Sequence, residues 1–241
     1  LDEFRQPKYD PDALNRRLER VTFAEKLDAF LKSEGALAMV RQSYRDGKLV
    51  HGEGYNYRVG HSPTLPGIEL AAEDYRRLAR LAKSGAPPQL EIDSNVRYDD
   101  SDTRAYNIIA EIPGTDPKAG YVMAGAHFDS WVAGDGATDN GAGSAVVMEA
   151  ARIIRKLGIR PKRTIRFVLW SAEEQGLLGS LAYVDKYLAA RPGPTEGEDG
   201  NALYYGWPSR YPITPKPGYG DLKAYFNMDN GSGKLRGIYA E

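Results

Sequence analysis

Residues 121–170 read YVMAGAHFDSWVAGDGATDNGAGSAVVMEAARIIRKLGIRPKRTIRFVLW. A short apolar run over residues 121–126 is followed by a helical apolar pattern over residues 144–157, and then by the β-branched and aromatic run of residues 164–170. Strands that alternate with helices of about 10 to 15 residues favour a largely parallel sheet covered on both faces. We therefore predict an α/β fold whose mostly parallel sheet carries helices on both faces. The same alternation continues outward, with strand patterns over residues 106–112 and 223–228 and a helical pattern over residues 176–188.

The first third of the chain also alternates between helix and strand, but it contains no cluster of catalytic residue types. Thr22 and Glu25 have the spacing of a capping box, so we expect a helix over residues 23–34. A change in composition separates residues 1–98 from residues 99–241, and we predict that these are two domains. In the first domain we expect strands over residues 36–40 and 65–70 and a helix over residues 72–83.

The alternation is interrupted over residues 191–221, a segment rich in proline and glycine that shows no apolar period. We expect a long surface loop there. Structureless loops of this length in compact domains tend to be either functional or disordered.

The composition excludes several classes of function. The 241 residues contain 32 Lys and Arg against 33 Asp and Glu. The net charge therefore gives no electrostatic attraction to nucleic acid or to an anionic membrane. No apolar run approaches the roughly 18 residues of a membrane span. The chain has no cysteine, which excludes disulfides, thiolate metal sites and cysteine nucleophiles. Any metal ligands must therefore come from His, Asp and Glu.

Two groups of polar residues lie where predicted strands or loops meet the sheet edge. His127 and Asp129 directly follow the strand over residues 121–126, and open α/β sheets bind ligands at such strand ends. Taken alone, the pair is equally well a surface histidine beside an acid. Asp139 follows in a glycine-rich loop before a helix, where Asp139 or Asn140 could instead serve only as the N-cap.

Two further groups of acids have the same placement. Glu173 and Glu174 follow the strand that ends at Trp170, and Asp229 follows the last predicted strand. Acids at the start of a helix are favourable on their own, and a lone Asp after a strand is usually a turn residue. However, one of two adjacent carboxylates can bind a metal while the other accepts a proton.

The joint pattern is more informative than its parts, because all four groups follow strands or loops at one edge of the same predicted sheet. An imidazole and several carboxylates are the nitrogen and oxygen ligands that suit zinc in a catalytic site. The sequence thus predicts a zinc centre at the carboxyl ends of the strands.

Four segments also resemble the leading motifs of the di-zinc aminopeptidase family of metallopeptidases, and most closely the branch that contains plasma glutamate carboxypeptidase (carboxypeptidase Q). The resemblance covers residues 104–241 and implies the zinc exopeptidase type of α/β fold. Residues 1–98 resemble, more weakly, part of the protease-associated α/β domain that precedes the sheet in this branch. The four segments are GAHFDS (125–130), GATDNG (136–141), WSAEEQGLLGS (170–180) and NMDNG (227–231).

The resemblance assigns metal ligands residue by residue. It implies two Zn²⁺ ions, with His127 and Asp229 as ligands of one, Glu174 as a ligand of the other, and Asp139 as the bridge between them. The family has one more histidine ligand, in a late motif that the present sequence does not contain. Because His51 and His61 match no motif, we expect that ligand beyond Glu241, in a longer parent protein.

The resemblance also implies a reaction. Glu173 would be the general base that activates water for hydrolysis at the terminus of a short peptide, and Asp129 would orient the His127 ring by accepting its second N–H. Two alternatives stay open: a single-zinc acyltransferase like glutaminyl cyclase, and a non-catalytic binding protein on the same fold. The resemblance points to a secreted or periplasmic protein, and it leaves a homo-oligomer open.

Overall fold

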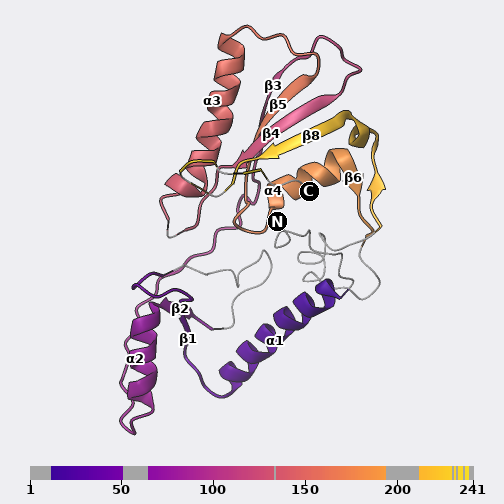
Figure 1. Cartoon of the computed structure of the whole chain (residues 1–241). Helices are drawn as coiled ribbons and strands as arrows, with labels where there is room; N and C mark the ends of the chain where they lie inside the picture. The colour runs from indigo at the N-terminus through magenta and orange to yellow at the C-terminus, as the bar shows by residue number, and fades with distance from the viewer. Residues whose placement is uncertain are drawn as a thin grey trace. The chain divides into compact units, whose positions relative to one another are not determined.

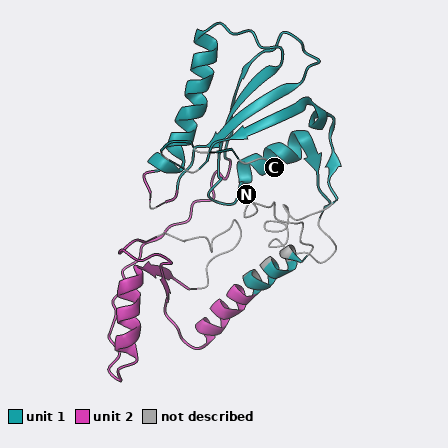
Figure 2. Ribbon diagram, in the orientation of Figure 1, with its two compact units in different colours: residues 1–22, 105–130, 136–241 teal, residues 23–104, 131–135 magenta. Residues whose placement is uncertain are grey.

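The structure is a computed structural model that describes residues 12–50, 65–132, 134–193, 212–229, 231, 233–235 and 237–238. It divides into two compact units, which are coloured separately in Figure 2. Unit 1 comprises residues 1–22, 105–130 and 136–241, and unit 2 comprises residues 23–104 and 131–135. The predicted domain boundary between residues 98 and 99 stays a prediction, since it was drawn from composition alone.

A four-stranded sheet forms the centre of unit 1 (Figure 1). The strand order is β3-β5-β4-β8, in which β4 pairs in parallel with both neighbours and β3 pairs antiparallel with β5. The predicted mostly parallel α/β sheet is therefore confirmed, with one antiparallel strand at its edge. The strands are β3 (Ile108–Ile112), β4 (Tyr121–His127), β5 (Thr164–Trp170) and β8 (Leu222–Asn227).

Helices cover both faces of this sheet, as Figure 1 shows. On one face the helix α3 (Gly143–Lys156) packs its Val147 against Ala126 and Phe167 of the sheet. On the other face lie α4 (Leu178–Tyr183) and the π-helical turn η3 (Val184–Leu188). Alternate residues of β4 and β5 divide between the two faces because side chains in a strand alternate. The second face has its own buried cluster, made of Tyr121, Met123, Val168, Trp170, Tyr183 and Leu188.

Unit 2 contains a two-stranded parallel sheet followed by a helix. The carboxylate of Glu73, in the first turn of the helix, accepts hydrogen bonds from the backbone N–H groups of Gly47 and Lys48. Arg76 of the same helix pairs with Asp46 at 2.7 Å. These contacts tie the loop after the first strand to the helix. The elements are β1 (Met39–Gln42), β2 (Gly67–Leu70) and α2 (Ala72–Ala82).

The first helix is longer than predicted. α1 extends over Ala13–Ser33, so Thr22 and Glu25 lie inside it and form no capping box at its start. Residues 13–21 contain neither glycine nor proline and are mostly good helix formers, so nothing in the sequence stops the helix at Thr22. The predicted strand over residues 36–40 is displaced in the structure to Met39–Gln42, where it pairs with β2.

Two predictions after β5 also need correction. The predicted helix over residues 176–188 begins only at Leu178, because Gly176 and Leu177 have φ values of 113° and 63°, which a right-handed helix cannot include. The predicted loop over residues 191–221 contains some regular structure in its last part. β7 (Thr214–Pro215) pairs with β6 (Ala189–Ala190), and a 3₁₀ turn, η5 (Pro217–Asp221), leads into β8.

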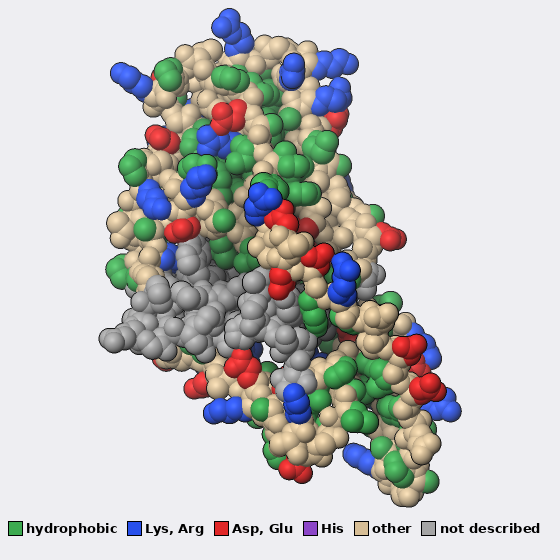
Figure 3. All heavy atoms as spheres, turned by 180° about the vertical axis from the view of Figure 1, so that it is seen from behind, with side chains coloured by type: hydrophobic (Ala, Val, Ile, Leu, Met, Phe, Trp, Pro, Cys, Tyr) green, Lys and Arg blue, Asp and Glu red, His purple; other side chains and the backbone are tan. Residues whose placement is uncertain are grey.

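The surface carries charges of both signs. Basic and acidic side chains are interspersed over the face seen in Figure 3, with hydrophobic side chains between them. This mixture agrees with the formal net charge of −1. No helix in the described ranges is both long and apolar enough to cross a membrane.

Candidate metal centre

The polar residues singled out in the sequence gather at one edge of the sheet in unit 1. β4, β5 and β8 run in parallel, so their carboxyl ends meet at the same edge. His127 is the last residue of β4 and lies opposite Trp170, the last residue of β5. Asp229 lies two residues beyond the end of β8.

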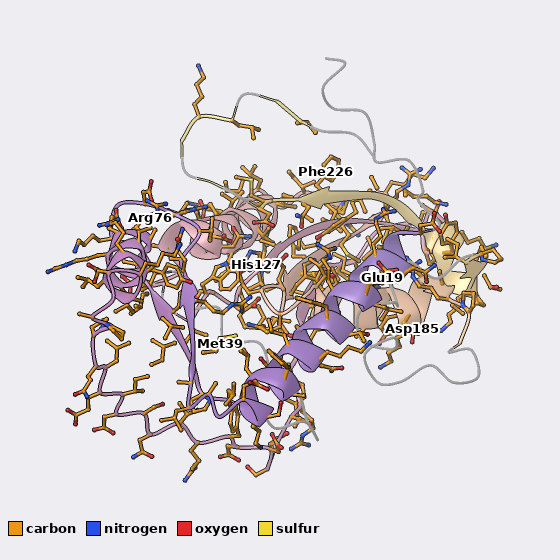
Figure 4. The ribbon with its side chains drawn as sticks, turned by 90° about the horizontal axis from the view of Figure 1, so that it is seen from below. Glu19, Met39, Arg76, His127, Asp185 and Phe226 are labelled. Carbon is orange, nitrogen blue, oxygen red and sulfur yellow. The ribbon has the colours of Figure 1, made fainter. Side chains whose placement is uncertain are left out.

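The imidazole of His127 is the centre of this group (Figure 4, where it is labelled). The residue is only 3% exposed, and its Nδ1 lies 3.1 Å from the backbone oxygen of Asp129. A carbonyl oxygen can only accept, so this contact requires the proton on Nδ1. Nε2 then faces three carboxylates, at 3.0 Å from Asp139, 3.4 Å from Asp229 and 3.8 Å from Glu173. Without a metal, Nε2 also carries a proton and donates it to Asp139, and a metal ion would take the place of that proton while Nδ1 keeps its own.

Asp139 lies in an irregular turn between β4 and α3. The turn, η2 (Ala137–Ala142), has π-helical hydrogen bonding, but Asp139 and Asn140 have non-helical backbone angles and the peptide bond between them is cis. Gly136 precedes the turn in the left-handed region, at φ 65°. A side chain is disfavoured there, which accounts for one of the glycines of this loop.

Glu173 and Glu174 lie in a tight turn between β5 and α4. The sequence placed them at the start of a helix, but the helix begins four residues after Glu174. The two carboxylate oxygens of Asp129 accept the backbone N–H groups of Glu173 and Glu174, each at 3.1 Å. Asp129 thereby connects the end of β4 to the acidic pair. Its predicted role toward the ring stays a prediction, and its Oδ1 lies 3.5 Å from Nδ1 of His127.

Asn107 also holds this turn, and sequence reasoning did not identify it. Its Oδ1 accepts the backbone N–H of Ser171, and its Nδ2 donates to the carbonyl of Gly179. The side chain thus closes the segment that carries Glu173 and Glu174. Nothing in the local sequence around Asn107 indicates these partners, which are more than 60 residues away.

Burial and charge crowding change the acidity of the site. Burial raises the pKa of Glu174 to about 7, and neighbouring carboxylates add to the effect. Burial also raises the pKa of Glu173. Burial alone disfavours a charged imidazole, but the surrounding carboxylates, led by Glu173, outweigh it and raise the pKa of His127. A cation at this position would relieve the repulsion among the acids.

The residues present fit a metal ion. Two sets of three potential ligand atoms lie within 4.8 Å of one another, namely His127 with Asp139 and Asp229, and His127 with Glu173 and Glu174. Oε1 of Glu174 is buried and has no hydrogen-bond partner within the part of the chain that the structure describes. Buried carboxylate oxygens without partners are costly unless a cation is present. The donors are one imidazole nitrogen and carboxylate oxygens, which suit zinc.

The raised pKa values predict how the metal-free protein responds to pH. An ordinary Glu loses its proton near 4.5, whereas folded Glu174 loses it near 7, so the folded state holds more protons between these values. Its stability should therefore fall as the pH rises from about 4.5 to about 7. The raised pKa of His127 acts in the same direction, since the stability it contributes is lost as the pH rises through that pKa.

Denaturant unfolding of the metal-free protein at several pH values measures this slope. The variant Glu174→Gln should show a shallower decline, because its side chain does not titrate. A stability that rises over this range, or an unchanged slope in Glu174→Gln, would contradict the assignment of these shifts.

The structure thus brings all six predicted site residues into one region of unit 1. Their individual roles as ligands, base and orienting residue remain proposals. The other two histidines of the chain, His51 and His61, lie outside the described residues.

The chain is similar in sequence to one known family and to several known proteins. Residues 107–234 match the family described as Peptidase family M28. The chain is 37% identical to carboxypeptidase Q of Xenopus laevis over 133 residues, covering 55% of this chain and 28% of that protein. It is 43% identical to leupeptin-inactivating enzyme 1 of Streptomyces exfoliatus over 100 residues, covering 42% and 23% respectively.

Among solved structures, the chain is similar to a Peptidase M28 precursor from Shewanella amazonensis SB2B, with a TM-score of 0.49 and 34% sequence identity. The match covers 63% of this chain and 34% of that one. The chain spans about a quarter of the length of the curated relatives that it matches.

Proposed function

Because the chain belongs to Peptidase family M28, whose match spans more than half of its residues, we propose that the protein is a zinc-dependent exopeptidase. It would hydrolyse the terminal peptide bond of short peptides. The main support for this proposal is the placement of His127. Its Nε2 faces Asp139 and Asp229 within 3.4 Å, and its Nδ1 donates a hydrogen bond to a backbone carbonyl.

The ligand set follows from the two groups of residues at the strand ends. His127 and Asp229 would hold one zinc ion, Glu174 would hold a second, and Asp139 would contact both. A bound zinc ion supplies Lewis acidity, which polarises a peptide carbonyl and makes a water molecule more acidic. The hydrogen bonds from the backbone N–H groups of Glu173 and Glu174 to Asp129 hold this turn beside the end of β4, where His127 lies.

Glu173 is the proposed general base. Its carboxylate takes a proton from the attacking water as the water oxygen bonds to the carbonyl carbon, and it then gives this proton to the amine nitrogen as the C–N bond breaks. The raised pKa of Glu173, which burial causes, brings the carboxyl closer to the working pH of such a proton transfer. Asp129 holds the backbone N–H of Glu173 and so fixes the start of its side chain.

The test uses the full-length protein and a panel of short peptides, including one that begins with glutamine. We expect release of a terminal residue, loss of this activity on dialysis against a chelator, and its return with Zn²⁺. Cyclisation of the glutamine peptide without hydrolysis would support the acyltransferase alternative instead. Hydrolysis that resists chelation would contradict the proposal.

The remaining expectations concern the rest of the molecule. We propose that residues 1–98 are part of a protease-associated-like domain, that the protein is exported, and that its partner is a peptide substrate. The resemblance of the four motifs to the carboxypeptidase Q branch supports export. Cell fractionation of the native host and the elution volume of the purified protein would test export and a homo-oligomer, respectively.

A further inference from the structure

Asn140 is one of the most deeply buried polar residues in the described part of the molecule, and the proposed reaction does not use it. It is 1% exposed. Its Oδ1 accepts the backbone N–H of Gly143, the first residue of α3, at 3.0 Å. Its Nδ2 donates to the backbone carbonyl of Met228 at 2.9 Å, although the two residues are 88 positions apart in the chain.

The second of these bonds joins the segments that carry two of the proposed ligands. Asp139 directly precedes Asn140, and Asp229 directly follows Met228. The bond between Asn140 and Met228 is therefore a cross-link, one residue from each carboxylate, between the η2 turn and the end of β8. His127 lies between the two carboxylates, at 3.0 Å from Asp139 and 3.4 Å from Asp229.

Gly143 packs closely against both ends of this cross-link. A Cβ on Gly143 would lie 2.2 Å from Oδ1 of Asn140 and 2.5 Å from the carbonyl oxygen of Met228, so only glycine leaves room for the amide. The next residue, Ser144, donates its hydroxyl to the carbonyl of His127 at 2.8 Å. The first turn of α3 thus fixes both the amide of Asn140 and the end of β4.

We infer that Asn140 is a positioning residue that sets the spacing of Asp139 and Asp229 around Nε2 of His127 for metal binding. This inference rests on the proposed zinc-dependent function. A simpler role is that Asn140 only caps α3 through its bond to Gly143, as asparagine often does at a helix start. The two roles differ in the bond to Met228, which a cap does not need.

Asn107 provides a matched control. It too is an asparagine whose amide bridges a backbone N–H and a distant carbonyl, but it holds the turn of Glu173 and Glu174. Substitution of Asn107 should lower the stability of the fold about as much as substitution of Asn140, without moving Asp139 or Asp229.

The sharpest variant is Asn140→Ser in the full-length protein. A serine hydroxyl can accept the N–H of Gly143 as a cap, but it is too short to reach Met228. Binding of Co²⁺ to the metal-free protein is measured by competition with a chelator and by the visible absorption of the bound ion. Removal of groups that orient ligands typically weakens metal affinity about 10- to 100-fold. We expect Asn140→Ser to weaken binding of the Co²⁺ ion held by His127, Asp139 and Asp229 by this factor and to change its spectrum.

Asn107→Ser acts on the turn of Glu174, so it should leave the affinity and spectrum of the ion held by His127, Asp139 and Asp229 close to those of the unaltered protein, even where both variants unfold at a similarly lowered temperature. Should Asn140→Ser fail to fold, Asn140→Thr serves in its place, since its hydroxyl can also accept the Gly143 N–H, is too short to reach Met228 and adds no charge beside the ligands. Unchanged Co²⁺ binding in the Asn140 variant, or equal weakening in both serine variants, would overturn the inference. Absence of binding by the unaltered protein would overturn the proposed function itself.

Discussion

The substitution Glu173→Gln is expected to lower kcat by about 100- to 10,000-fold, the usual contribution of a general base, while the zinc content stays nearly unchanged. An amide is similar in size to the carboxylate but cannot accept a proton from water. The backbone of Glu173 is held by Asp129 independently of the side chain, so the turn should keep its shape. Steady-state kinetics with a short peptide and metal analysis of the same sample measure the two quantities.

The control for this change is Glu149→Gln. Glu149 lies on α3, is about half exposed and pairs with Arg152, outside the strand-end group. This variant should have nearly unaltered kcat and zinc content. Loss of zinc in Glu173→Gln would instead indicate that Glu173 is a metal ligand. This outcome is structurally possible because Glu173 belongs to one of the two groups of potential ligands.

The substitution His127→Ala is expected to reduce activity by more than the roughly 100-fold loss typical of removing a group that only orients a ligand. His127 supplies the single nitrogen in both groups of potential ligands, and its removal leaves only carboxylates. These acids would then repel one another without the imidazole between them. Both kcat/KM and the zinc bound per chain should fall, and the folded protein should remain measurable by circular dichroism.

The other two histidines are the natural controls. His51→Ala and His61→Ala remove the same side chain elsewhere in the sequence and should retain zinc and activity. Zinc loss in either control comparable to that in His127→Ala would show that the ligand was assigned to the wrong histidine.

The central sheet was predictable because its strands are marked by residue type. The run from Thr164 to Trp170 is rich in β-branched and aromatic residues, and β5 has these bounds in the structure. Element starts were less predictable. The start of α1 was misplaced because the capping-box pattern at Thr22 also occurs inside a helix, and the start of α4 was misplaced because Leu177 adopts a left-handed conformation that leucine rarely takes.

The site was predictable only as a set of chemical groups. The positions of His127 and the acids at strand ends follow from the parallel sheet, in which the carboxyl ends coincide. The contacts that hold these groups in place cannot be predicted from the sequence. Asp129 reaches N–H groups 44 and 45 residues away, and Asn140 reaches a carbonyl 88 residues away. In the sequence, Asn140 is only a possible helix N-cap, because the residues around it give no indication of a contact with Met228.

The most direct test of the zinc centre is a crystal structure of the zinc-loaded full-length protein, with anomalous diffraction recorded on both sides of the zinc edge. We predict an anomalous peak within bonding distance, about 2.0 to 2.2 Å, of Nε2 of His127 and of carboxylate oxygens of Asp139 and Asp229, and a second peak beside Glu174. Zinc bound elsewhere, with these side chains hydrogen-bonded only to one another, would contradict it.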